Sequence, residues 1–249
     1  MTPSSSAGFT LVELLVTMAL LSIMLVALSA VQSSTMQASN QIAGEASRLQ
    51  ALQDATGYVG DRVRAASALS PSLTVDGSAC SLTPAVGGLP CFAVLVGEIR
   101  QTGATAQYGA NAYLYLVYRL VARTQLASAD RTPNIWADAN TFALVESRQL
   151  ICAPDAAPVL PCAAVSTAGF TVVPTSVPPA ITTTATNVLM DYATLDQNPG
   201  TFTAFSNTAS TVDMPGQLVL RFRQKQRQQG EIIYTPRTGP FELTVQRRN

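Results

Sequence analysis

The sequence predicts an α+β protein, in which a long N-terminal helix with a membrane-spanning apolar half packs on a C-terminal antiparallel β-rich domain. Three observations support this prediction. Residues 9–31 are mainly apolar and carry a single charge, at Glu13. No proline lies between Pro3 and Pro71, so proline does not interrupt a helix over residues 4–70. After Pro71, short alternating apolar runs are separated by turn-forming residues, as in antiparallel sheets.

The apolar segment 9–31 is long enough to cross a membrane. As a helix it extends for about 34 Å at about 1.5 Å per residue, more than the hydrocarbon core of about 30 Å. Its apolar side chains lie on every side of the helix, as expected where all sides meet lipid or other apolar helices. A secretory signal peptide and an ordinary single-span anchor are the alternatives. Neither alternative explains Glu13, because an acidic side chain at mid-bilayer costs roughly 3 kcal/mol and needs a partner.

A polar leader ending at Gly8 is followed by Phe-Thr-Leu-Val-Glu-Leu-Leu. This combination resembles the processing signal of type IV prepilins and pseudopilins. The resemblance implies that a prepilin peptidase cleaves between Gly8 and Phe9, that the new Phe9 amine is N-methylated, and that Glu13 becomes the fifth residue of the mature chain. The Phe9 ammonium would then be the partner of Glu13, within the same helix or, as the family implies, on the adjacent subunit.

Residues 32–70 are predicted to continue the helix in amphipathic form, with Pro71 as its stop. Apolar residues recur there every three or four positions. The stripe consists of Ile42, Ala46, Leu49, Leu52, Thr56, Val59, Val63, Ala66 and Leu69. Gly44, Gly57 and Gly60 each cost about 1 kcal/mol relative to alanine, so bending or local unwinding is expected there. Residues 48–69 resemble the helix of W/J-type minor pilins.

Residues 71–249 are predicted to form the β-rich extracytoplasmic domain, after the leader 1–8, the apolar helix 9–31 and the amphipathic helix 32–70. The expected strands are residues 92–99, 112–122, 141–151, 170–173, 217–224, 231–235 and 241–246. The last three are expected to form a meander, with connections at 228–230 and 236–240. Residues 165–187 are expected to form an extended loop with a short strand.

The four cysteines form two pairs that are close in sequence. These pairs are Cys80 with Cys91 and Cys152 with Cys162. Four cysteines allow three connectivities, of which the two local bridges are favoured in an extracytoplasmic domain. The alternative is a metal site, but the spacings are long for a zinc knuckle and the chain has no histidine. We therefore expect disulfides and no metal.

Enzymatic activity has little support in the sequence. The chain has no histidine and a single lysine, and it lacks a glycine-rich phosphate loop and a Gly-x-Ser-x-Gly elbow. We expect no catalytic residues and no cofactor, and an unrecognised pair of carboxylates is the alternative.

The segment 218–227 alternates between an apolar row and a basic row. Leu218, Leu220 and Phe222 are expected in the core. The basic row is Arg221, Arg223, Lys225 and Arg227. This row is a candidate contact for DNA phosphates. A solvated strand face, or a contact with acidic groups on a neighbouring subunit, is favoured because few aromatic residues interleave with the cations.

These features predict a minor pilin or pseudopilin, a structural subunit of a type IV pilus or type II secretion-like filament that assembles through its N-terminal helix after leader cleavage. The expected partners are other pilins or pseudopilins, the prepilin peptidase and an inner-membrane assembly platform. The subunit is expected to cross the inner membrane once before assembly and then to enter a periplasmic or cell-surface filament. The alternatives are a DNA- or surface-binding subunit of a pilus used in DNA uptake or adhesion, and a permanently anchored ectodomain.

Overall fold

The computed structural model describes residues 10–84, 88–102, 105–131, 137, 140–152, 163–164, 180–181, 185–197, 200–207, 217–228 and 230–246. The leader 1–8, Phe9, Cys162 and the expected strand 170–173 lie outside these residues. The chain divides into two compact units, Met1–Ser47 and Arg48–Asn249. Each unit is described by itself.

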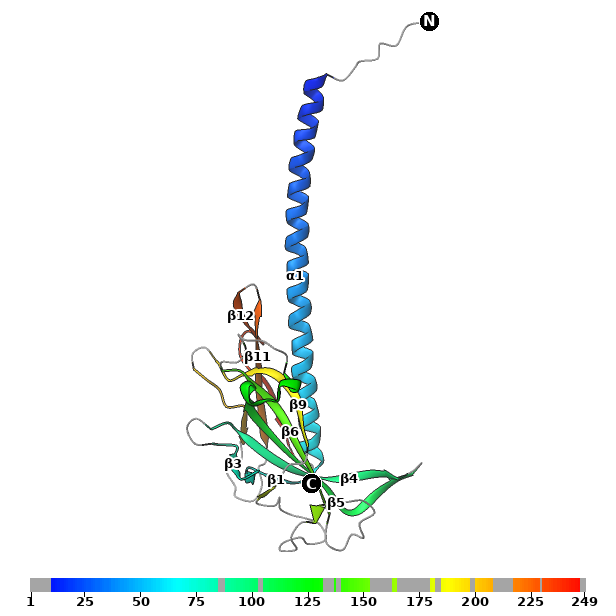
Figure 1. Cartoon of the computed structure of the whole chain (residues 1–249), viewed down its shortest axis with the longest axis vertical. Coiled ribbons are helices and arrows are strands. Elements are labelled where there is room, and N and C mark those ends of the chain that lie inside the picture. Colours follow the sequence, from blue (N-terminus) through cyan, green and yellow to red (C-terminus); the bar gives the residue numbers. More distant parts are fainter. Residues whose placement is uncertain are drawn as a thin grey trace. The chain divides into compact units, whose positions relative to one another are not determined.

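One helix, α1, runs without interruption over Leu11–Ala65 (Figure 1). It remains α-helical through Gly44, Gly57 and Gly60, so the expected local unwinding at these glycines does not occur. In the unit Arg48–Asn249, the predicted apolar stripe is buried from Leu52 to Ala66, whereas Leu49 and Leu69 are partly buried. In the unit Met1–Ser47, by contrast, the stripe residues Ile42 and Ala46 are exposed.

The end of the helix differs from the prediction. The helix ends at Ala65, and the residues up to 70 form strand β1, Ala66–Ser70. This strand pairs antiparallel with the strand that begins at Cys91, and the Ser67 hydroxyl donates a hydrogen bond to the Leu95 carbonyl at 2.9 Å. Ala66, Ala68 and Leu69 favour a helix by intrinsic propensity, so the strand forms against the local preference. Pairing with a distant strand therefore decides the conformation, which sequence periodicity does not reveal.

The large sheet contains, among the described residues, strands in the order β1-β4-β5-β6-β9-β11-β10. Their bounds are β4 Cys91–Thr102, β5 Thr105–Ala122, β6 Phe142–Cys152, β9 Ala185–Thr194, β10 Phe205–Asn207 and β11 Leu218–Gln228. Strand β7, Ala163–Ala164, pairs parallel with β6, whereas the other pairs of this sheet are antiparallel. The α+β prediction is confirmed.

The predicted C-terminal meander is wrong in its connectivity. Strands β12, Glu231–Thr235, and β13, Phe241–Val245, form where they were predicted. Both pair with β11: β12 pairs with residues 224–228 and β13 with residues 218–222. Strand β11 is long enough to serve both because it extends to Gln228 rather than ending at residue 224.

The prediction of a loop over 165–187 is also wrong in part, because residues 185–187 begin strand β9. A second, smaller sheet was not predicted. It consists of β3, Ser78–Ser81, β2, Ser72–Val75, and β8, Ala180–Ile181, in that order.

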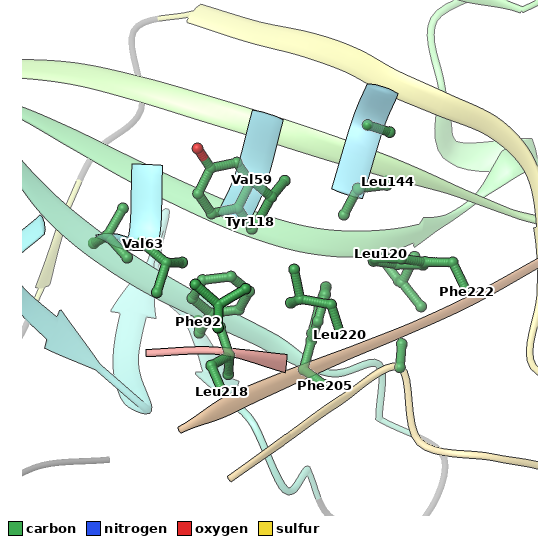
Figure 2. Packing of buried hydrophobic residues seen from close by; sticks show 14 of the residues in the cluster. Val59, Val63, Phe92, Tyr118, Leu120, Leu144, Phe205, Leu218, Leu220 and Phe222 are labelled. Carbon is green, nitrogen blue, oxygen red and sulfur yellow. The ribbon is translucent and has the colours of Figure 1, made fainter. Parts of the chain in front are cut away.

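The hydrophobic core occupies both faces of the large sheet. On the α1 face, Phe92 packs against Tyr118 and Phe205, with ring centroids 5.2 and 5.0 Å apart. Phe205 in turn packs against Phe222, with ring centroids 5.6 Å apart (Figure 2). Leu218 and Leu220 lie in the same cluster, as predicted. The opposite-facing residues of β4 and β5 form a second cluster with β2 and β3. The domain is therefore layered, and α1 from Leu52 onward is an integral part of it.

Gly60 lets α1 approach β13 closely. A Cβ atom at Gly60 would lie 3.1 Å from Leu243 Cδ2 and 3.3 Å from Val245 Cγ2, whereas one at Gly57 would meet nothing within 4 Å. We expect Gly57→Ala to raise the free energy of unfolding by up to about 1 kcal/mol through helix propensity. We expect Gly60→Ala to lower the free energy of unfolding by about 1 kcal/mol, because overpacking of the added methyl group against β13 costs more than the gain in helix propensity. Denaturant unfolding of this matched pair tests the contact, and equal stabilisation by both changes would contradict it.

Candidate functional site

The described chain begins with a reciprocal hydrogen-bond arrangement between Thr10 and Glu13. The Thr10 backbone N–H and the Thr10 hydroxyl each donate to Glu13 Oε2 at 3.0 Å, and the Glu13 N–H donates to the Thr10 hydroxyl oxygen at 3.3 Å. This is a capping box, in which the residue before the helix and the third helical residue satisfy each other's backbone N–H groups. The carboxylate also lies at the positive end of the helix dipole. Glu13 therefore has a role within its own chain.

The capping box was readable from the sequence, since Thr-x-x-Glu before an apolar run is its signature. From the sequence, Glu13 was interpreted only as a charge in need of a cationic partner. The two roles differ in what they require. A cap needs an acceptor oxygen, whereas an ion pair needs a negative charge.

The helix from Leu11 to Asn40 presents an exposed apolar surface. Every residue of this stretch is exposed, and its large apolar side chains retain at least 52% of their accessible surface. Five of its hydroxyl groups donate to backbone carbonyls three or four residues earlier at 2.8–2.9 Å, so these five do not require solvent as a partner. These donors are Thr17, Ser22, Ser29, Ser34 and Thr35. In the described residues, α1 is the helix that is long and apolar enough to cross a membrane.

The predicted cleavage residues, Gly8 and Phe9, lie outside the described residues. No distance between the Phe9 amine and the Glu13 carboxylate is therefore available, and their pairing stays a prediction.

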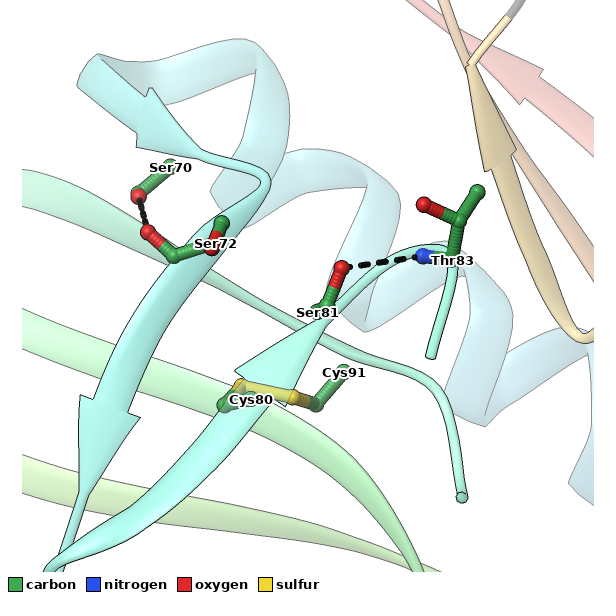
Figure 3. The surroundings of a disulfide bond; sticks show 6 residues. All are labelled: Ser70, Ser72, Cys80, Ser81, Thr83 and Cys91. Atoms are coloured by element: carbon green, nitrogen blue, oxygen red, sulfur yellow. Dashed lines mark hydrogen bonds between the residues drawn. A yellow bond between two sulfur atoms is a disulfide. The ribbon is translucent and has the colours of Figure 1, made fainter. Parts of the chain in front are cut away.

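The predicted disulfide between Cys80 and Cys91 is present, with the two Cα atoms 5.5 Å apart (Figure 3). It joins β3 of the small sheet to the first residue of β4 in the large sheet, and both cysteines are buried. Cys162 lies outside the described residues. With Cys80 and Cys91 paired, a second intrachain bridge has only the Cys152–Cys162 combination left, and that bridge stays a prediction.

The predicted basic row on β11 is mostly engaged inside the protein. Arg221 forms an ion pair with Glu242 at 2.7 Å and donates to the Ser206 hydroxyl at 2.8 Å. Arg227 is exposed and donates to the Gly230 carbonyl at 3.2 Å. Arg227 is thus the member of the row whose charge is most available to solvent.

Arg223 and Lys225 are buried, with 6% and 7% exposure, so these two residues do not form the solvated strand face that was the favoured reading. Arg223 donates to the Asp196 carbonyl at 3.1 Å and lies over the Tyr234 ring at 4.4 Å. Lys225 donates to the Asn140 carbonyl at 2.8 Å. Burial lowers the pKa of the Lys225 ammonium, and Asp196 acts in the opposite direction. The alternation of β11 was predicted correctly. The sequence did not predict that the second face of this strand is also covered.

The described residues contain no group of three or more His, Cys, Asp or Glu side chains placed to hold a metal ion. The features that the structure does bring together are an exposed, capped apolar helix and a disulfide-linked antiparallel β domain. They define the class of the protein as an α+β protein with an N-terminal helix that is long and apolar enough to span a membrane.

Comparison with known families makes the identification more specific. Residues 3–29 match the prokaryotic N-terminal methylation motif, and this match indicates a type IV pilin-like prepilin. Proteins of this kind are structural subunits that assemble through the N-terminal helix, after anchoring in the membrane. No curated protein and no solved structure matches the chain.

Proposed function

We propose that the protein is a minor pilin or pseudopilin of a type IV pilus or type II secretion-like filament. The observation that carries this proposal is the methylation motif at residues 3–29, whose residues from Leu11 onward lie on a helix with exposed apolar side chains. Such a surface is costly in water but suits lipid before assembly and other apolar helices after assembly. The partners are other pilins or pseudopilins, a prepilin peptidase and an inner-membrane assembly platform.

The chemistry of the N-terminus follows from this role. Cleavage between Gly8 and Phe9 creates a cationic amine, which is then N-methylated, at the same end of the helix as Glu13. In a bundle of apolar helices the Phe9 ammonium of one subunit pairs with the Glu13 carboxylate of its neighbour, because pairing offsets part of the cost of removing both charges from water. This pair sets the axial register between subunits.

Leader removal is expected to depend on Gly8. Because glycine lacks a Cβ atom, it lets a protease approach the scissile backbone closely. We expect Gly8→Ala to block or slow leader removal, so that the unprocessed chain accumulates in the membrane. Mass spectrometry of the intact protein distinguishes the full-length chain from one that begins with N-methylated Phe9.

Ser6→Ala is the matched control, since it changes the leader away from the scissile bond and should be processed normally. An intact leader on the wild-type protein in its native cell would contradict the proposal and favour a permanently anchored ectodomain.

A test of the alternative, a DNA-binding subunit, requires a variant other than the triple replacement of the basic row. Replacing Arg221, Arg223 and Lys225 together would remove internal hydrogen bonds of two buried cations, so loss of binding would not distinguish contact from unfolding. Arg227→Gln changes an exposed side chain instead. If the basic row contacts DNA, this change weakens binding and lowers the salt dependence of log K by about 1.

If the protein is a purely structural subunit, the wild-type domain should show no salt-dependent DNA binding, and Arg227→Gln should have no effect on DNA uptake. This is the outcome we expect. Glu231→Gln is the control, since it removes a neighbouring exposed charge of opposite sign.

A further inference from the structure

Tyr192 has an unusual backbone conformation within strand β9. Its φ angle is +61°, in the left-handed region that bulky residues rarely adopt. The register between β9 and β6 shifts between Phe142 and Leu144, where β9 carries an extra residue. This is a β-bulge, a feature that redirects a side chain. Asp191 supports the conformation, because its Oδ1 accepts the Tyr192 N–H at 2.7 Å.

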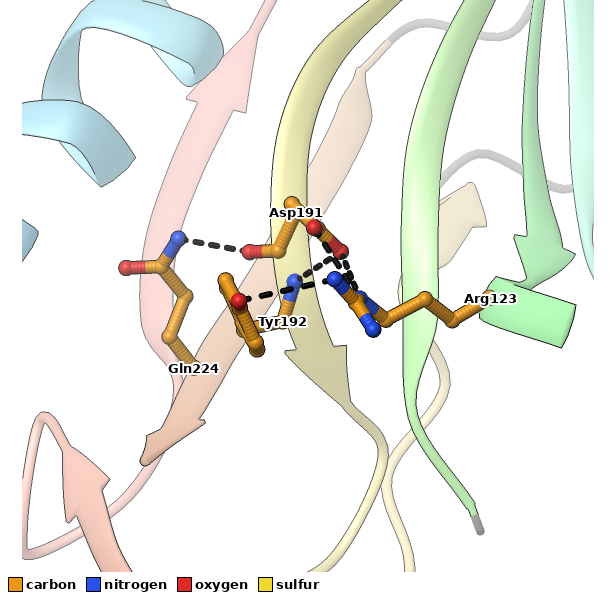
Figure 4. A network of polar contacts seen from close by, with 4 residues as sticks. All are labelled: Arg123, Asp191, Tyr192 and Gln224. Atoms are coloured by element: carbon orange, nitrogen blue, oxygen red, sulfur yellow. Dashed lines mark hydrogen bonds and ion pairs between the residues drawn. The ribbon is translucent and has the colours of Figure 1, made fainter. Parts of the chain in front are cut away.

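Two arginines lie at cation–π distance from the redirected ring. The guanidinium carbon of Arg123 is 4.6 Å and that of Arg48 is 5.6 Å from the Tyr192 centroid, both within the favourable limit of about 6 Å. Arg123 is fully buried, and its Nε donates to both carboxylate oxygens of Asp191 at 2.9 and 3.0 Å (Figure 4). The Gln224 amide donates to the Asp191 carbonyl at 2.8 Å. Arg123 therefore contacts the ring from the sheet side, while Asp191 and Gln224 hold the backbone that carries it.

Arg48 is the contact on the helix side, and its position in the chain is informative. It is the first residue of the compact unit Arg48–Asn249. The first fully buried residue of α1, Leu52, follows one turn later. Partial burial lowers the pKa of the Arg48 guanidinium, while Tyr192 and Asp191 act in the opposite direction. The Arg48–Tyr192 contact thus lies at the N-terminal limit of the part of α1 that belongs to the β domain.

We propose that Tyr192 acts as a latch: its contact with Arg48 determines how far toward the N-terminus α1 stays packed on the β domain. The bulge on β9 places the ring against Arg48, and Arg123 and Asp191 hold the ring and its strained backbone in place. When the latch is closed, the helix segment 48–51 belongs to the domain. When the latch opens, this segment separates as a local unit while the sheet and the helix from Leu52 onward stay folded. The length of helix free to adjust during assembly is then set within the subunit.

Hydrogen–deuterium exchange of the full-length chain in detergent tests the latch, and the measurement does not depend on leader cleavage or filament assembly. Two variants open it from opposite sides. Tyr192→Gly removes the ring and tolerates the positive φ, so it tests the side chain without adding backbone strain. Arg48→Gln removes the cation from a half-exposed position on the helix. In both variants we expect backbone amides of residues 48–52 to exchange roughly tenfold faster, with the sheet amides unchanged.

Arg62→Gln is the matched control. Arg62 belongs to the same helix, and its guanidinium carbon lies 5.2 Å from the centroid of the Tyr58 ring. Its replacement should leave amide exchange at residues 48–52 unchanged. Unchanged exchange at residues 48–52 in both Tyr192→Gly and Arg48→Gln would overturn the proposal. Faster exchange throughout the sheet would also overturn it, because the ring would then stabilise the whole domain and not a local segment.

Discussion

A Glu13→Ala variant is expected to be processed at Gly8 but incorporated into filaments at least about tenfold less than the wild-type protein. The reason is the loss of the carboxylate that pairs with the neighbouring Phe9 ammonium, since breaking a buried pair costs about 3–5 kcal/mol. Quantitative immunoblots of sheared filaments and membranes measure the distribution. Intact-mass measurement of the membrane fraction confirms that the leader has been removed.

The capping box makes a sharper version of this experiment possible. Glutamine at position 13 keeps an acceptor oxygen for Thr10 but carries no charge. We expect Glu13→Gln to be incorporated as poorly as Glu13→Ala, because the ion pair with the Phe9 amine is lost in both. Thr10→Ala keeps the charge and loses the cap, at a cost of about 1 kcal/mol to the helix, so it should be much milder. Normal incorporation of Glu13→Gln would show that the cap, and not the charge, is what assembly requires.

The N-terminal helix was predictable because its signals are local. A polar leader, a glycine, an apolar run and a single carboxylate stand next to one another in the sequence, and the helix that they predict forms without needing any distant partner. The paired strands 92–99, 112–122 and 141–151 were predicted for a similar reason, since each contains a short apolar run bounded by turn-forming residues, and residues 91–96, 115–118 and 143–147 are buried on both faces. The disulfide Cys80–Cys91 followed from sequence proximity and compartment.

The errors occur where a distant partner decides the structure. Ala66–Ser70 continues a helical pattern, but it pairs with β4. Strand β11 is shared by β12 and β13, which no periodicity in the sequence could reveal. The buried state of Arg223 and Lys225 depends on carbonyl acceptors contributed by loops far away in the chain. Charge alternation shows which residues share a face, but not what covers that face.

The second large effect is expected at Glu146, a fully buried carboxylate on β6. It accepts hydrogen bonds from the Tyr118 hydroxyl at 2.7 Å, from the Tyr58 hydroxyl at 3.3 Å and from Arg148 Nε. Burial, together with the Glu146 charge, raises the pKa of Tyr118, so this hydroxyl stays protonated and remains a donor. The hydrogen bond to Glu146 raises the pKa of Arg148 despite partial burial. Glu146 therefore accepts hydrogen bonds from three donors.

We expect Glu146→Ala to lower the free energy of unfolding by about 3 kcal/mol, because two hydroxyls and a guanidinium lose a charged acceptor in a dry site. The estimate takes the low end of the range for a broken buried pair, since the Arg148 side chain is 39% exposed and regains some water. Tyr118→Phe removes one donor and leaves the others, so it should cost about 1–2 kcal/mol. Urea unfolding of the full chain in detergent, followed by near-ultraviolet circular dichroism, measures both. A Glu146→Ala variant within about 1 kcal/mol of wild type would contradict this account.

The Glu146 and Glu13 variants should fail in different ways, which separates folding from assembly. Tyr58 lies on α1 and Glu146 on β6, so the Glu146 network is a polar attachment between the assembly helix and the β domain within the unit Arg48–Asn249. Glu146→Ala leaves the residues of the methylation motif unchanged, and its mature chain should therefore carry a normal N-terminus while the domain unfolds more readily. Glu13→Ala should retain the wild-type stability of the β domain and lose incorporation. A double-mutant cycle between Glu146→Ala and Tyr118→Phe should show a coupling of about 1 kcal/mol, because either single change already removes the hydrogen bond from Tyr118 to Glu146.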